Sequence, residues 1–137
     1  MSDLPDRFDY AVDPAEAIVY ARMWGVVSGA DMLRLVSAVH ADPRWEDGFD
    51  AVYDCSAVRA HLVGPEDIAP IVREEAASAP GHDVHVQSRA EDGGTISHML
   101  AAYCRRHGKA MTVHATLADA LAALGRDAPS SDLGGTP

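Results

Sequence analysis

The sequence is poor in cysteine and in basic residues, and both shortages exclude classes of function. Its 137 residues include two cysteines, Cys55 and Cys104, which are too few for a disulfide framework, so we expect free thiols. Lysine and arginine together number 11 against 21 aspartates and glutamates, which gives a net charge of −10. Because an acidic domain repels the phosphate backbone, nucleic acid is not an expected partner.

Long apolar runs are also missing. No segment approaches the roughly 20 apolar residues of a membrane-spanning helix, and the start MSDLPDRFDY lacks the basic and apolar regions of a signal peptide. We therefore expect a cytoplasmic protein without a membrane span. The hydrophobic fraction of 47% is that of a globular chain, and the length suits one domain with a core.

Composition divides the chain into one domain and two ends. Residues 1–7 are polar, and we expect them to form a flexible N-terminus. The segment RDAPSSDLGGTP, residues 126–137, has little to bury and is predicted to be a disordered tail. Residues 8–125 then form a single domain.

Within that domain the spacing of apolar residues alternates between strand and helix periods. Strands are predicted at residues 8–12, 17–23, 51–55, 83–88 and 110–114, and the first two read as a hairpin. Helices are predicted after the second strand, from Pro65, after Gly93 and Gly94, and from Thr116. This order predicts an α/β fold with a five-stranded, mainly parallel mixed sheet and an N-terminal β-hairpin.

The last two predicted strands alternate apolar with polar side chains. In DVHVQS and AMTVH, each valine or methionine is followed by a polar residue or by the strand end. Strands buried on both faces are usually continuously apolar, so the alternation predicts helices mainly on one face of the sheet. The polar side chains expected on the opposite, open face are His85, Gln87, Thr112 and His114.

Three segments carry a resemblance to a known family: AIVYARMWGVVSGADMLRLV, DPRWEDGFDAVYDCSAV and KAMTVHATLADALAALG. They resemble the SpoIIAA-like superfamily, which includes STAS domains and a bacterial STAS-like branch, over about residues 8–125. The resemblance implies a β–α superhelix and a small regulatory or ligand-binding module that is not an enzyme. In phosphoregulated STAS domains a serine lies where the turn after the third strand meets the next helix. Here that region reads AHLVGPED, without a hydroxyl group, which implies that the phosphorylation switch is absent.

The stretch that follows the third predicted strand holds the candidate ligand-binding residues. Ligands of open α/β sheets bind at the carboxyl ends of the strands, which points to Asp54, Ser56, Arg59 and, after the next strand, Arg89. Two alternatives remain open. Asp54 would accept hydrogen bonds from the following turn, and Ser56 would be an ordinary turn residue.

No complete catalytic or metal-binding set is visible. Cys55 has only His61 as a nearby base, and a buried, inert thiol is the simpler interpretation. His82 and His85 lie three residues apart and fall on opposite faces of a strand. His85 and His114 would supply only two imidazole ligands. We therefore expect no catalytic residue, no metal and no cofactor.

Two functions from different classes follow. The first is a non-catalytic STAS-like regulatory module that binds a protein partner or self-associates through the open face or a sheet edge. The second is a carrier of a small apolar molecule or lipid, because the superfamily shares its fold with CRAL-TRIO lipid-binding domains. Met32, Met99, Leu100 and Tyr103 would line such a pocket, or would be plain core residues.

The missing hydroxyl group generates a first prediction. Incubation with STAS-type serine kinases should give no stoichiometric phosphorylation within residues 54–67, as read by phosphopeptide mapping. Full modification of Ser56 would contradict it.

Overall fold

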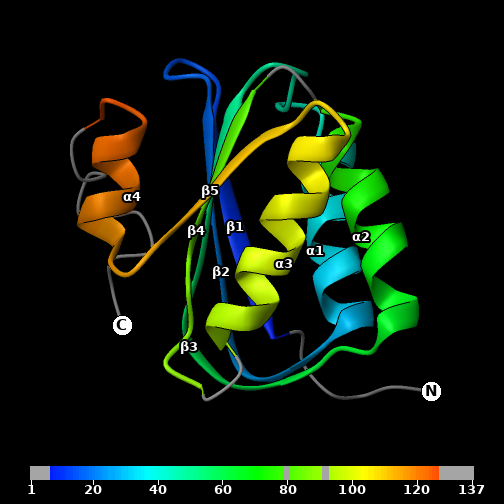
Figure 1. The fold of residues 1–137 in the computed structure, drawn as a ribbon. Helices are drawn as coiled ribbons and strands as arrows, with labels where there is room; N and C mark the ends of the chain where they lie inside the picture. Colours follow the sequence, from blue (N-terminus) through cyan, green and yellow to red (C-terminus); the bar gives the residue numbers. More distant parts are fainter. Residues whose placement is uncertain (1–6, 79–80, 91–92, 127–137) are drawn as a thin grey trace.

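The computed structural model describes residues 7–78, 81–90 and 93–126 (Figure 1). The strands are β1 Phe8–Asp13, β2 Ile18–Ser28, β3 Asp50–Leu62, β4 His82–Val86 and β5 Ala110–His114. The helices are α1 Gly29–Ala41, α2 Pro65–Ala76, α3 Gly93–Arg106 and α4 Leu117–Ala123. The predicted N-terminus and tail lie outside the described residues, except Arg7 and Arg126. Arg126 Nη2 lies 3.3 Å from Asp50 Oδ2.

The five strands form one sheet in sequential order, β1-β2-β3-β4-β5. Strands β1 and β2 are antiparallel, and the other pairs are parallel. The predicted α/β class, mixed sheet and N-terminal hairpin are therefore confirmed. Each of α1, α2 and α3 connects two neighbouring parallel strands, and right-handed connections place them side by side on one face (Figure 1).

Helix α4 lies on the opposite face of the sheet (Figure 1). Its Ala120 and Leu121 are buried in a second core cluster, away from the main core under α1–α3. The sheet side of this cluster consists of Ile18, Val52, Val84 and Val86. Helices therefore lie mainly on one face, as predicted, but α4 covers part of the face that was expected to be open.

The prediction that His85 lies on the open face is wrong. His85 is 3% exposed, and its Nε2 lies 3.5 Å from Oε1 of Glu75 in α2, on the α1–α3 face. Val84 and Val86 instead point toward α4. The prediction assigned every apolar side chain to the α1–α3 face, whereas β4 is covered on both faces and its polar side chains meet charged groups beneath α2. Thr112 and His114 share the α4 face, because they pair in register with Val84 and Val86.

Strand β3 is much longer than predicted. Residues 56–62 were expected to form a turn, but they continue the strand and pair with Trp24–Ser28 of β2, which also extends beyond its predicted end. The pairing contains two register shifts, between Arg22 and Trp24 and between Gly25 and Val26. These irregularities interrupt the two-residue period, which explains why the sequence pattern did not show the extension.

At the starts of α1 and α2, carboxylates accept hydrogen bonds from the backbone. Asp31 N donates to Ser28 Oγ at 3.1 Å, and Ser28 N donates to Asp31 Oδ2 at 2.9 Å, which forms a capping box. At α2, Pro65 occupies the first turn, and Gly64 N donates to Asp67 Oδ2 at 2.8 Å. A carboxylate therefore already occupies the N-terminus of α2.

Coverage of the second face by α4 generates a stability prediction. Leu121 is 2% exposed, so Leu121→Ala should lower the free energy of unfolding by about 3 kcal/mol. Leu124, which is only partly buried against the same cluster, provides the matched control, and Leu124→Ala should cost about 1 kcal/mol. Urea titration measures both. Equal, small losses would show that α4 does not pack as described.

Candidate functional site

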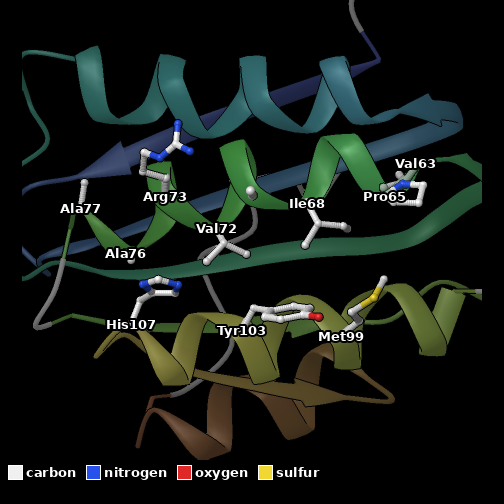
Figure 2. Close-up of a pocket in the computed structure, with 12 residues that line it drawn as sticks. Val63, Pro65, Ile68, Val72, Arg73, Ala76, Ala77, Met99, Tyr103 and His107 are labelled. Atoms are coloured by element: carbon white, nitrogen blue, oxygen red, sulfur yellow. The ribbon is translucent and has the colours of Figure 1, made fainter.

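A groove of about 820 Å³ lies between α2 and α3 (Figure 2). Figure 2 shows Ile68 and Val72 reaching from α2 toward α3, with Met99 and Tyr103 lying opposite them on α3. These apolar side chains form the middle of the groove. Tyr103 remains 40% exposed, so a large aromatic surface faces solvent there.

Small residues on α2 keep the groove open. Its lining includes Ala69 and Ala76, where larger side chains would fill the gap between the helices. The two ends of the groove differ. Val63, Gly64 and Pro65 lie at the start of α2, whereas Arg73, Ala77 and His107 lie at the other end (Figure 2).

The groove contains few polar groups, and two of them have unused hydrogen-bonding capacity. Figure 2 shows His107 directed toward the α2 side of the groove, while Arg73 extends from its rim toward α1. Within residues 7–78, 81–90 and 93–126, no side-chain hydrogen bond or ion pair involves Arg73 or His107. A cleft with apolar walls and a few unused polar groups is typical of a ligand-binding site.

The sequence prediction located part of this groove. Met99 and Tyr103, two of the four residues named as candidates for a pocket lining, do line it. Met32 and Leu100 are 6% and 0% exposed, and they belong to the main core. The α2 wall was missed because its alanines carry no sequence signal that separates an open groove from ordinary helix packing.

A buried cluster of ionisable groups joins α2 and α3 to the sheet. Asp83 Oδ1 lies 3.3 Å from Lys109 Nζ, and Lys109 Nζ donates to Ser78 Oγ at 2.9 Å. On the same face, His85 Nε2 lies 3.5 Å from Glu75 Oε1, and Cys104 Sγ donates to Glu75 Oε2 at 3.4 Å. Glu75 is therefore held by one residue of β4 and one of α3.

Burial and neighbouring charges shift the pKa values within this cluster. Burial, reinforced by the charge of Glu75, raises the pKa of Asp83 from 3.8 to about 7, although Lys109 and His85 oppose the shift. Burial lowers the pKa of His85, but the nearby Glu75 and Asp83 outweigh that effect and raise it above 6.5. Exposed fractions in the cluster are 0% for Lys109, 1% for Asp83 and 2% for Glu75. A substrate cannot reach groups that are so fully enclosed.

The cluster was missed at the sequence level, although two signals pointed to it. Lys109 is the only lysine of the chain, and it stands immediately before a strand. Asp83 and His85 are two residues apart on a strand and therefore share one face. The prediction placed His85 on the open face of the sheet. It therefore did not bring Asp83 and His85 together with Lys109 and Glu75 beneath α2.

The structure does not join the four predicted ligand-binding residues through their side chains. Asp54 Oδ1 accepts a hydrogen bond from Ser56 N at 2.9 Å, which matches the alternative that assigned Asp54 a local backbone role. Ser56 and Arg59 are exposed on β3, and Arg89 is exposed after β4. In the described part of the chain, that local contact apart, no hydrogen bond or ion pair involving a side chain links any two of these four residues.

Cys55 is buried, as predicted. Burial, assisted by the nearby Asp54 and Glu75, raises the pKa of its thiol from 9.0 to about 12, so the thiolate is scarce at neutral pH. His61 Nε2 lies 3.0 Å from Ser88 Oγ. Among the described residues, no group of three metal-ligating side chains is positioned to hold an ion.

Comparisons of the chain with protein-family models, with curated proteins and with solved structures gave no match. Within the part of the chain that the structure describes, none of the helices combines the length and the apolarity needed to cross a membrane. Any functional assignment therefore rests on the geometry described above.

The buried cluster generates a prediction about pH. A carboxyl group with a raised pKa binds its proton more tightly in the folded than in the unfolded chain. The stabilisation from Asp83 is thus complete below its ordinary pKa of 3.8 and is lost as the pH rises through about 7. The raised pKa of His85 acts in the same direction at higher pH. The free energy of unfolding should fall between about pH 4 and about pH 7 because of Asp83, with a further fall above pH 6.5 because of His85, and Asp83→Asn should flatten the first of these falls.

Asp83→Asn also leaves Lys109 buried without its counter-charge, which costs stability in itself. The control is the double variant Asp83→Asn/Lys109→Met, which removes both charges. It should keep the flattened pH profile and regain part of the lost stability in urea titrations. If the free energy of unfolding of both the single and the double variant depends on pH as it does in the unaltered protein, the raised pKa of Asp83 is wrong.

Proposed function

We propose that this chain is a non-catalytic binding module that holds a small apolar molecule in the groove between α2 and α3. The observation that carries the proposal is the groove itself, a space of about 820 Å³ with apolar walls that no described side chain fills. Burial of apolar surface is the main favourable term in association, so such walls favour an apolar occupant.

The lining residues support binding more than catalysis. None of the described residues that line the groove is a cysteine, a serine or a carboxylate, and His107 has no described hydrogen-bonding partner to orient it as a base. A nucleophile, a base and an orienting group would all be needed for acyl-transfer chemistry. The ionisable groups beneath the groove are enclosed, which suits a structural role.

We further propose that the module is related to STAS-like proteins but has no phosphorylation switch. The start of α2 supports the absence of the switch. There the Asp67 carboxylate accepts the Gly64 N–H, where a phosphate group would otherwise bind. Ser56 lies six residues before the end of β3, roughly 20 Å along an extended strand. A phosphate group on Ser56 would therefore not reach the N-terminus of α2.

A second candidate function, binding of a protein partner, is favoured by one surface. Val26 and Leu62 are 40% and 64% exposed. Both lie on the α4 side of the sheet, because Leu62 pairs with Ser28 and the intervening Val27 points into the main core. Leu62→Lys should weaken self-association in sedimentation experiments if this surface mediates it, and should leave the α2–α3 groove unchanged.

Filling the groove tests the leading proposal. Ala69 lines the groove on α2, so the indole ring of Ala69→Trp should occupy part of the space. The uncharged fluorescent probe N-phenyl-1-naphthylamine should bind the unaltered protein with enhanced emission, and Ala69→Trp should weaken binding about tenfold. The matched control is Ala122→Trp, at an exposed alanine of α4 on the other side of the sheet.

The control variant should bind the probe as the unaltered protein does. Unfolding curves of both variants establish that each is folded. Equal binding by Ala69→Trp and Ala122→Trp would show that the probe does not occupy the groove, and this result would overturn the proposal.

A further inference from the structure

The two ends of the α2–α3 groove differ in charge. Arg73 lies in the last turn of α2, and Arg106 is the last residue of α3. The guanidinium carbon of Arg106 lies 5.5 Å from the centre of the Tyr103 ring. Glu66 and Asp67 stand at the opposite end, in the first turn of α2. In a chain with a net charge of −10, this is a local concentration of positive charge beside an apolar surface.

An alternative role for the arginines is to neutralise the helix ends. The C-terminus of a helix carries about −0.5 elementary charge, so the ends of α2 and α3 contribute about −1 together. Two guanidinium groups exceed this, and positive charge remains. At the other end, the N-termini of α2 and α3 contribute about +1 together, which is less than the two carboxylates that stand there.

Other acidic groups near the cationic end are already engaged. Glu74 Oε2 lies 2.9 Å from His40 Nδ1, on the α1 side of α2. Glu75 is 2% exposed and is held by His85 and Cys104 beneath the helices. Among the described residues, Arg73 has no carboxylate partner and Arg106 contacts only an aromatic ring, so neither side chain is committed to an ion pair.

We infer that the groove takes an anionic amphiphile, with its charged head beside Arg73, Arg106 and His107 and its apolar tail directed along α2 and α3 toward Val63. This inference rests on the proposed function and adds the charge and the orientation of the ligand. A carboxylate or sulfate at the head position accepts an N–H from His107, and the two arginine side chains are exposed and long enough to turn toward it, Arg73 from its direction toward α1.

The remainder of the groove suits an alkyl tail. From the cationic end, the walls continue through Val72 and Tyr103 to Ile68 and Met99, and then to Val63 (Figure 2). Met99 is unbranched and flexible, and such a side chain adapts to alkyl chains of different shape. Glu66 and Asp67 at the far end repel a second negative charge, which favours a single orientation.

The test compares three ligands with the same ten-carbon tail: decanoate, decan-1-ol and decylammonium. Each is titrated against bound N-phenyl-1-naphthylamine, below its aggregation concentration and at low salt. Decanoate should displace the probe at about fivefold lower concentration than decan-1-ol, and decylammonium should be the weakest. Added salt should reduce the advantage of decanoate and leave decan-1-ol unchanged.

The double variant Arg73→Gln/Arg106→Gln tests whether the charged head of the ligand lies beside these two arginines. It should bring decanoate to the affinity of decan-1-ol and leave decan-1-ol binding as in the unaltered protein. The matched control is Arg59→Gln, an exposed arginine on β3 outside the groove lining, which should preserve the preference for decanoate.

The outcomes separate the inference from the proposed function. If all three ligands displace the probe equally, or if the double variant keeps the preference for decanoate, the groove binds apolar molecules but the anionic head is wrong. If none displaces the probe, and Ala69→Trp does not affect probe binding, the groove is not the binding site and both proposals fail.

Discussion

Right-handed connections between neighbouring parallel strands decide where the other parts of this molecule lie. Because β2, β3, β4 and β5 are adjacent in chain order, α1, α2 and α3 are forced onto one face, side by side and pointing the same way. Two parallel helices with alanines on one wall, such as Ala69 and Ala76, leave a groove that runs along α2 and along α3 from Met99 onward. The chain that follows β5 crosses to the other face, where α4 buries Val84 and Val86.

Charged groups, as well as apolar packing, hold α2 and α3 on the sheet. Taking Asp83, Lys109 and Glu75 out of water costs free energy, and their mutual contacts offset this only when all partners are present. Because Glu75 belongs to α2 and contacts both β4 and α3, it ties the end of α2 to the sheet and to its neighbour. A cluster of this kind favours one arrangement of α2 and α3 over slipped alternatives, and so it helps to define the cationic end of the groove.

The sequence predicted the elements better than the faces they bury. Periodicity was sufficient for the order of strands and helices and for the hairpin, because each is set by residues close together in the chain. The orientation of β4 was not predictable in the same way, since Asp83 and His85 turn inward only because Lys109 and Glu75, distant in sequence, meet them there. For the groove, Met99 and Tyr103 were named as candidate pocket residues, whereas the opening depends on the spacing of two helices, which a single sequence does not show.

The most direct test of the central claim, that a ligand lies between α2 and α3, uses the methionine methyl groups. The chain contains five methionines, of which Met99 lines the groove while Met23, Met32 and Met111 are buried in the main core. In protein with ¹³C-labelled methionine methyl groups, titration with decanoate should shift the Met99 signal in a saturable way and leave the three core signals in place. Saturable binding that leaves Met99 unmoved, or that shifts the core methionines instead, would contradict the account.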